Sequence, residues 1–502
     1  MDPAPPYFLP DDMAMKAEPR IYCTPLRPET PVADQCASSA THVFGPRCIG
    51  TDPDGPRFAV KDRTVSWMGW DFHVDIHGMY GLMIANLRYQ GERLAYVMHA
   101  TEFSAVYSGF SNKKDLYYSD GGYEMGNCAT TLKTGLQCPD EAVYLPSLGY
   151  DSGYVWGGAL EGSETDKAVC IFEAPKNRAL YQHAQMRYEG MPDSALYVRT
   201  VLTVGNYDYT QTFEVNLDGS FHWNKELSGY AVGSYVLPDA PSTVKSDMFG
   251  AMLSKSSTGT LHTHSAGYKF DLDVAGTSNS FAVKTLKYGP MAEAIAASSI
   301  PMDLTGIAHA SPHTYYYETS KIANEGVWDM DGDNTWTPPP SCLMSSPGTK
   351  FLVKSDQVNK YGQARGYLID VPIGQHQLLP EHDPFLHLQN FTKCSIMATK
   401  QNDADIEPMS MEVFGNLYPK GAATGTDLSH FADGESLDHE DLVIYASSTK
   451  PHWVKTEDLP VPSTMGKPIS FEPVNYFVDG LNPMKHMPAT IKMADTCVVS
   501  GA

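Results

Sequence analysis

Residues Thr203-Val204-Gly205-Asn206-Tyr207-Asp208-Tyr209 separate two runs of alternating apolar and polar residues, 194–202 and 210–215. Both runs are rich in β-branched and aromatic residues, so we predict that both are β-strands. Gly, Asn and Asp together favour a chain reversal, and on local preference alone the stretch is a turn. Whether residues 203–209 have a function beyond this turn depends on motifs elsewhere in the chain.

The composition of the 502-residue chain predicts a strand-rich globular fold with a sizeable core. Hydrophobic residues make up 42% and charged residues 19% of the sequence. Gly 41, Pro 36 and Tyr 29 favour strands and turns, and the best helical window is 290–297. Alternating segments continue to about residue 480 without an internal repeat, which favours one large β domain.

The charge balance and the cysteines exclude several classes of function. The net charge is −23 and no basic patch with interleaved aromatics occurs, so we expect no nucleic-acid partner. An acidic surface would attract cationic ligands such as amines. We see no apolar run near the roughly 20 residues of a membrane span. Nine scattered cysteines without a CxxC pair do not suggest a structural zinc site. The start of the chain shows no signal peptide, which leaves the compartment undetermined.

The chain divides into an arm, a domain and a tail. Residues 1–50 are rich in Pro, Ala and Thr, and we predict an extended N-terminal arm. Residues 51–480 carry the strand patterns, and 481–502 are a C-terminal tail. Within the domain, 64–74 alternates like one half-buried strand, and 81–89 follows as another.

The order Thr-x-x-Asn-Tyr-Asp-Tyr resembles the cofactor motif of copper amine oxidases, where the first Tyr is oxidised in place to topaquinone. The matching residue is Tyr207, preceded by Asn206. The segments 64–74 and 81–89 also resemble the opening of that family's catalytic domain. The resemblance covers 51–480 and implies an all-β fold, a large two-sheet antiparallel β sandwich with few short helices. It also implies a homodimer.

Two histidines on one predicted strand are the first candidates for metal ligands. His262 and His264 lie two apart, so on a strand both point to one face and reach one ion. An isolated His-x-His is more often a pair of surface histidines. Here it leads into a strand ending Phe-Asp-Leu-Asp, which resembles the family's copper strand. The paired histidines elsewhere match no ligand pattern: His309 and His313, His382 and His387.

The third copper ligand implied by the resemblance is His452. It heads His452-Trp453-Val454-Lys455-Thr456-Glu457-Asp458-Leu459-Pro460, which is similar to the family's His-x-x-x-x-Glu-Asp-Trp-Pro segment. Leu459 stands where that segment has Trp. Neutral imidazole suits copper as well as zinc, so the ligand type agrees with either ion.

The catalytic base implied by the resemblance is Asp120. The segment 116–126 resembles the family's Asp-x-Gly run but is one residue shorter before Gly126, and Asp-Gly-Gly is also a common turn. Tyr107 aligns with a tyrosine that hydrogen-bonds the quinone. The implied reaction is oxidative deamination of a small primary amine by O2, giving aldehyde, ammonia and hydrogen peroxide. A carboxylate must remove a proton from the amine's α-carbon, and the cofactor carries the redox chemistry.

The resemblance further implies a calcium-like second cation site. Its ligands would be carboxylates and backbone oxygens, which are the hard ligands that Ca²⁺ prefers. The resemblance implies the carboxylates of Asp271, Asp273 and Asp441 and the backbone oxygens of Leu272 and Leu442. The alternative, a set of solvated acids, stays open. The segment 329–334 also looks like a calcium loop, but it lacks the Gly and Glu such a loop requires.

Cys138 and Cys170 resemble the family's intradomain disulfide pair, although a reducing compartment would keep them as thiols. Two alternatives to the enzyme remain. A catalytically silent, amine-oxidase-like β-sandwich interaction protein is suggested by the short Asp120 segment and by Leu459. A plain copper-binding protein would keep the histidines without needing Tyr207. The preferred amine is not encoded in any motif.

Overall fold

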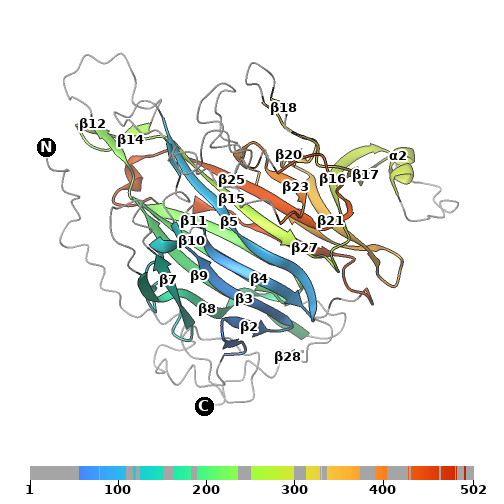
Figure 1. The fold of residues 1–502 in the computed structure, drawn as a ribbon, viewed down its shortest axis with the longest axis horizontal. Coiled ribbons are helices and arrows are strands. Elements are labelled where there is room, and N and C mark those ends of the chain that lie inside the picture. Colours follow the sequence, from blue (N-terminus) through green and yellow to red (C-terminus); the bar gives the residue numbers. More distant parts are fainter. Residues whose placement is uncertain are drawn as a thin grey trace.

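The computed structural model shows a fold made almost entirely of antiparallel sheet (Figure 1). It describes residues 56–78, 80–108, 117–119, 125–150, 162–181, 189–235, 250–298, 312–327, 329–330, 336–373, 391–403, 428, 431–462, 465–480, 482 and 491–492. The predicted arm, 1–50, and most of the predicted tail, 481–502, lie outside the described residues. The predicted all-β class is confirmed.

Two large sheets, which we call sheet A and sheet B, form the body. Sheet A orders its strands as β1 (Ala59–Lys61), β2 (Thr64–Trp67), β3 (Trp70–His77), β4 (Gly81–Tyr89), β5 (Glu92–Tyr107), β15 (His262–Leu272), β25 (Leu442–His452), β23 (Ile396–Lys400) and β20 (Cys342–Leu343), with β6 (Tyr117–Ser119) beside β5. Sheet B runs β17 (His313–Ile322), β16 (Asn279–Pro290), β21 (Thr349–Val358), β22 (Ala364–Asp370), β27 (Ile469–Val474), β11 (Phe221–Gly229), β10 (Tyr207–Asn216), β9 (Glu189–Val204), β8 (Gly162–Tyr181) and β7 (Val143–Tyr150).

The remaining elements are short. Sheet B also pairs β24 (Asp438–Glu440), β26 (Met465–Gly466) and β28 (Ile491–Lys492), and two small sheets contain β12 (Gly233–Tyr235), β13 (Gly250–Met252) and β14 (Ser257–Thr260), and β18 (Asp329–Met330) and β19 (Trp336–Thr337). The helical elements with complete bounds in the described part of the chain are α2 (Met291–Ala297), η1 (Met125–Cys128) and η6 (Thr456–Asp458). The helical window 290–297 is therefore confirmed. No helix of the described part of the chain combines the length and apolar character that a membrane crossing needs.

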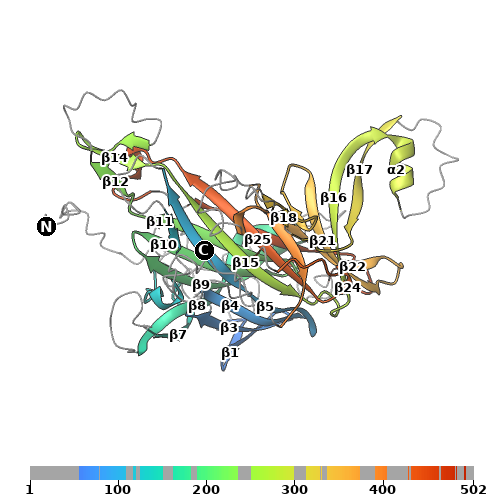
Figure 2. The same ribbon diagram turned by 45° about the horizontal axis from the view of Figure 1, so that its top comes forward.

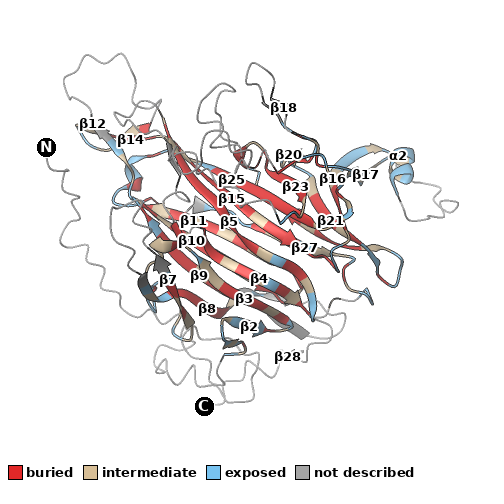
Figure 3. Cartoon of the chain, in the orientation of Figure 1, coloured by how far each residue is buried: buried red, intermediate tan, exposed pale blue. Residues whose placement is uncertain are grey.

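The core lies between the two sheets, because strand alternation turns one apolar row of each sheet inward. Strand β11 alternates buried and half-buried residues along its whole length. Rings from the two sheets meet edge to face: Phe72 and Phe213 have centroids 5.6 Å apart, and Trp223 and Phe270 have centroids 6.2 Å apart. Figure 3 shows the resulting buried band running along the central strands.

The sequence prediction of one strand over 64–74 is wrong. Met68 and Gly69 have φ of 47° and 87°, and they turn the chain between β2 and β3, which pair with each other. The buried residues change phase across the turn: Trp67 and Trp70 both face the core although they are three positions apart, which one continuous strand does not allow. The strand predicted over 81–89 is β4.

A hairpin made of β16 and β17, capped by α2, projects away from the body (Figure 2). The helix α2 has no buried residues, and the outer face of the hairpin carries exposed tyrosines. The end of the hairpin next to α2 therefore lies outside the core, and its exposed apolar side chains are available for another surface. The first residues of β16, Phe281 among them, are buried in the core.

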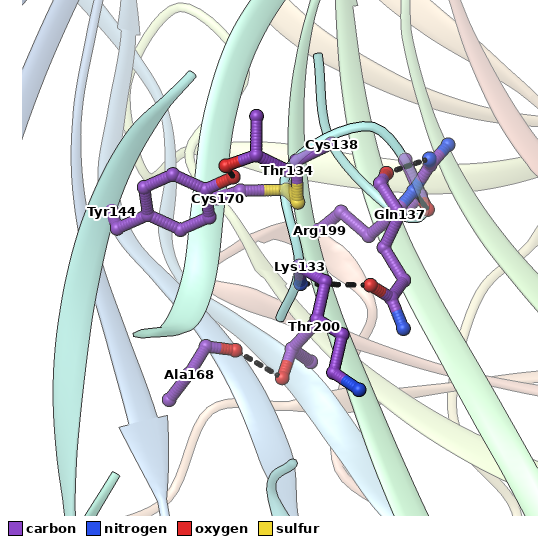
Figure 4. Close-up of a disulfide and its surroundings, with 10 residues drawn as sticks. Lys133, Thr134, Gln137, Cys138, Tyr144, Ala168, Cys170, Arg199 and Thr200 are labelled. Atoms are coloured by element: carbon purple, nitrogen blue, oxygen red, sulfur yellow. Dashed lines mark hydrogen bonds between the residues drawn. A yellow bond between two sulfur atoms is a disulfide. The ribbon is translucent and has the colours of Figure 1, made fainter. Parts of the chain in front are cut away.

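Two disulfides are present in the described residues. Cys138 and Cys170 are bonded, as predicted, with Cα atoms 6.4 Å apart. Arg199, which donates to the Gln137 carbonyl at 2.8 Å, holds the loop that carries Cys138 against β9 (Figure 4). Cys342 and Cys394 form a second bond that ties β20 to the segment before β23, and the sequence did not indicate it.

Candidate metal centre

Three strands that are far apart in the sequence build one side of the site. Strand β15 is paired with β5 on one side and β25 on the other, and the three lie side by side in Figure 1. The register sets His262 opposite both Tyr107 and His452. Side chains of directly paired residues point to the same face, so these three, together with His264 two positions along, face sheet B.

The other side of the site comes from the stretch that opened the sequence. Gly205 and Asn206 form a two-residue connection between β9 and β10, and Gly205 has φ of 59°. Glycine accepts that conformation without steric cost. Tyr207 is the first residue of β10 and is buried. The stretch is thus a hairpin turn, and it also delivers a tyrosine to the histidines.

Further contacts fix the turn. The Thr203 hydroxyl donates to Asp208 at 2.6 Å, and the Asn206 amide donates to the Tyr230 carbonyl at 2.6 Å. The Tyr230 N–H returns a bond to the Asn206 carbonyl at 2.7 Å. A Cβ atom on Gly229 would lie 2.3 Å from that same carbonyl oxygen, so only glycine fits there. Asn206 therefore anchors the turn to the end of β11.

The three predicted histidines converge. The ligand atoms of His262, His264 and His452 all lie within 4.8 Å of one another, and all three residues are buried. The Tyr207 hydroxyl lies 2.9 Å from Nε2 of His262 and 2.8 Å from Nδ1 of His452. A phenol and three imidazoles therefore share one small volume between the sheets.

The outer nitrogens of two of these rings already have acceptors. His262 Nδ1 donates to the Thr260 carbonyl at 2.7 Å, and His452 Nε2 donates to Asp458 at 2.9 Å. In the neutral form of each ring, the nitrogen that faces Tyr207 then carries a lone pair. Tyr207 has one proton for two such lone pairs. Among the described residues, neither nitrogen of His264 has a hydrogen-bond partner, although the ring is buried. Buried polar atoms left in this state fit a cation at the centre.

Burial keeps the imidazoles of His262 and His264 neutral. It lowers the pKa of His262 to about 3. It also lowers the pKa of His264 well below its ordinary value, and the neighbouring His262 and Lys225 lower it further. Burial raises the pKa of Tyr207, with smaller contributions from Tyr107 and Asp458. At neutral pH the site therefore offers unprotonated imidazole nitrogens, which is the form that binds a transition metal.

The family model for "Copper amine oxidase, enzyme domain" matches residues 59–494. The chain belongs to the copper amine oxidase family. The suspected resemblance is confirmed, and the cluster of His262, His264 and His452 has the nitrogen ligands that copper accepts.

Known proteins agree with this membership. Human "Amine oxidase [copper-containing] 3" is 28% identical over 438 residues, which cover 85% of this chain and 52% of that protein. Human "Diamine oxidase [copper-containing]" is 26% identical, covering 88% of this chain and 55% of its own length. The chain thus spans about half the length of these curated relatives.

Solved structures share the fold. The Aspergillus nidulans amine oxidase superimposes with a TM-score of 0.69 at 23% identity, covering 92% of this chain and 57% of its own. A copper-containing benzylamine oxidase from Hansenula polymorpha gives a TM-score of 0.70 at 20% identity, covering 87% of this chain and 63% of its own. The predicted sandwich architecture is that of these amine oxidases.

Tyr107 packs on the metal cluster, whereas Asp120 lies outside the described residues. The Tyr107 ring stacks on His262 with centroids 4.5 Å apart and planes inclined by 19°. Strand β6, which leads directly to Asp120, pairs with β5 at 104–106, beside Tyr107. The backbone before Asp120 therefore runs next to the site, and its role as a base stays a prediction.

The predicted second cation site lies at the opposite end of β15 and β25. Leu272 and Leu442 are directly paired, which sets Asp271 and Asp273 near Asp441. Burial, and then the like charges of Asp441 and Asp273, raise the pKa of Asp271 to about 7; burial and then Asp273 raise the pKa of Asp441 to about 6. These mutually repelling carboxylates are compatible with a cation between them.

The aspartates differ from the histidine cluster in one respect. Asp273 is held by Arg93, whose Nε lies 2.6 Å from a carboxylate oxygen. In the described residues, the groups whose ligand atoms converge within 4.8 Å are the three histidines and Glu325, Asp433 and Glu435. In the group of Glu325, Asp433 and Glu435, the carboxylate of Glu325 already accepts hydrogen bonds from the backbone N–H groups of Lys400 and Asp433. The second cation site therefore stays a prediction.

Sequence reasoning did not assign a role to Asp458 or Thr260. Asp458 is buried, accepts from His452, and also accepts the Lys455 N–H at 3.0 Å. It lies in the segment that matched the family pattern, so its position was visible but its function was not. Thr260 acts through its carbonyl, which has no side-chain signature.

We expect Asp458→Asn to weaken copper binding by roughly 10–100-fold, because the partner that orients a ligating histidine contributes about that much. The measurement is copper affinity by competition with a chelator. The matched control is Glu457→Gln, which removes the adjacent but exposed carboxylate and should leave the affinity unchanged. Equal copper affinity in wild type and Asp458→Asn would contradict the assignment.

Proposed function

We propose that the chain is a copper-dependent primary-amine oxidase in which Tyr207 is the precursor of topaquinone. One observation carries this: the Tyr207 hydroxyl lies within 2.9 Å of two of the three clustered histidines. Copper bound there would supply the one-electron chemistry that lets O2 oxidise the phenol ring. The overall reaction converts a primary amine, O2 and water into aldehyde, ammonia and hydrogen peroxide.

The residues of the chain have distinct parts in this proposal. His262, His264 and His452 hold the ion as neutral imidazoles. Tyr107 restricts the His262 ring by stacking on it. The buried surroundings exclude water and so strengthen electrostatic contacts inside the site. Asp120 is proposed to remove the proton from the amine's α-carbon, which is the step general-base catalysis accelerates.

The cofactor is tested by copper addition. Protein made without copper should be colourless and turn pink when copper is added in air, whereas Tyr207→Phe should stay colourless. Tyr209→Phe is the matched control, because Tyr209 is a buried tyrosine on the same face of the same strand. Peptide mapping locates the modified residue. Unmodified Tyr207 in copper-loaded, aerated wild type would reject the proposal.

Turnover separates the enzyme from its alternatives. Asp120→Asn should keep copper and quinone but lose at least about 100-fold in peroxide release with a panel of amines. Hydrazine titration measures the quinone in parallel. A wild type with a full quinone titre and no peroxide would favour the silent interaction protein. Copper retention without any quinone would favour the plain copper-binding protein.

The proposed second cation is calcium, held by Asp271, Asp273 and Asp441 with the backbone oxygens of Leu272 and Leu442. The raised pKa values mean that the folded protein binds more protons than the unfolded chain between about pH 4 and 7. Protonation of Asp271 and Asp441 therefore favours the folded protein. Without calcium, this favourable contribution to the free energy of unfolding is complete below about pH 4 and is lost as the pH rises through about 7.

Calcium should therefore raise the unfolding temperature strongly at about pH 8, where it offsets the repulsion, and weakly at about pH 5. Asp271→Asn should remove most of that response. The control is Asp62→Asn, which neutralises an exposed carboxylate in a loop away from the cluster. A wild-type unfolding temperature that ignores calcium at both pH values would rule out the cation.

We also propose that the chain forms a homodimer, with a second copy covering the β16–β17 hairpin. Tyr288 and Tyr315 are 62% and 71% exposed, and their rings contact each other at 4.7 Å between centroids. Exposed apolar side chains gathered on a projecting element are typical of a protein interface.

The double variant Tyr288→Ser, Tyr315→Ser should shift the protein from dimer to monomer in sedimentation velocity, because it removes the aromatic contact area. Tyr361→Ser is the control, since Tyr361 is 65% exposed but lies outside the hairpin. A double variant that sediments as the wild-type dimer would exclude the hairpin as the interface.

A further inference from the structure

A lysine is buried in the core behind the metal cluster. Lys225 lies on β11, points inward between the two sheets, and is only 4% exposed. Lysine is among the residues least often buried to this degree, so a buried lysine needs a reason. Its Nζ donates to the Ser448 carbonyl at 3.4 Å and lies 5.6 Å from the centroid of the Phe103 ring. Both contacts suit a positive charge.

The contacts of Lys225 place its ammonium on the His264 side of the cluster. Ser448 is paired with Ala266, two positions along β15 from His264. The Phe103 ring packs against Tyr209 at 5.2 Å, and Tyr209 lies 6.2 Å from the His264 ring, all between centroids. Lys225 therefore reaches from sheet B to β25 and β5, the two strands that flank the strand carrying His264.

Opposite charges flank the site. Asp458 is an acidic residue that holds His452 on one side of the cluster. Lys225 stands on the His264 side. A buried charge is screened far less than a surface charge, so each of these two groups contributes to the potential at the cluster.

We propose that Lys225 is a positioning residue that makes the tri-histidine centre accept small monoanions from the His264 side. The proposal rests on the proposed copper function. A fixed cation in a region of low dielectric constant stabilises a negative ligand at a neighbouring metal and leaves a neutral ligand almost unaffected. In the proposed reaction, O2 takes up two electrons and two protons to become hydrogen peroxide, so a cation favours the stages at which electrons precede protons.

A purely structural lysine would behave differently. If Lys225 only satisfied the Ser448 carbonyl, removing its charge would change the unfolding temperature and leave anion binding at the metal unchanged. Anion affinity is therefore the measurement that separates the two roles.

The test uses azide, a small monoanion, titrated spectroscopically into copper-loaded protein. Lys225→Met and Lys225→Gln should each raise the azide Kd about tenfold, the effect of a unit charge at about 12 Å with an effective dielectric constant near 20. Lys225→Arg should stay within about twofold of wild type, because it keeps the charge. Lys450→Met is the matched control: Lys450 is paired with His264 but exposed, so solvent screens its charge.

Copper content and unfolding temperature are measured on every variant. Lys225→Gln keeps a hydrogen-bond donor for the Ser448 carbonyl, so it answers the question if Lys225→Met fails to fold. An azide Kd unchanged in copper-replete Lys225→Gln overturns the proposal while leaving the amine oxidase function intact. A wild type that takes up no copper would instead overturn the proposed function itself.

Discussion

The pairing of β15 with β5 and β25 is the constraint on which the metal centre depends. Hydrogen bonds on both sides fix the register of β15, so His262 has no freedom to slide relative to Tyr107 or His452. A shift by one residue would turn the whole set away from sheet B, because side chains alternate along a strand. Such a shift would also expose the apolar residues of the core at a large cost in free energy. The register of the sheet therefore fixes the positions of the side chains in the site.

The burial that makes the site precise also determines its charge state. An imidazole in water is protonated for part of the physiological range, whereas His262 and His264 stay neutral because burial disfavours their charged forms. That leaves lone pairs with too few protons to satisfy them. A cation resolves the deficit at the point where Tyr207 adds a phenol oxygen. The packing that removes water from the histidines also buries the Tyr207 ring next to them.

Local sequence patterns predicted the parts of the site that depend on strand alternation and turn chemistry. His262 and His264 share a face because they lie two apart, and Gly205-Asn206 reverses the chain for the reason its composition indicates. His452 and the Cys138–Cys170 bond came only through the family pattern. No spacing rule specifies a contact across 245 residues, such as that of Tyr207 with His452.

What the sequence could not show depends on tertiary packing. The turn at Met68 shows in the sequence only as a change of phase between Trp67 and Trp70, which both face the core, and the prediction of one strand missed that change. Asp458 looks like any acidic residue until the short helix η6 turns it onto His452. Lys225 occupies an inward position of β11, where a pattern reading expects an apolar residue. Only the packing of sheet A against β11 brings the charge of Lys225 near the strands that carry the histidines.

These separations also decide the order of folding and metal binding. The ligands come from β15 and β25, which are remote in sequence, so no local segment could gather them before the sheets assemble. In small zinc domains the metal supplies the folding free energy. Here two disulfides and an extensive aromatic core hold the strands together among groups that need no ion. We therefore expect the chain to fold without the metal, and the proposed oxidation of Tyr207 to follow folding, once the ring and the histidines face each other.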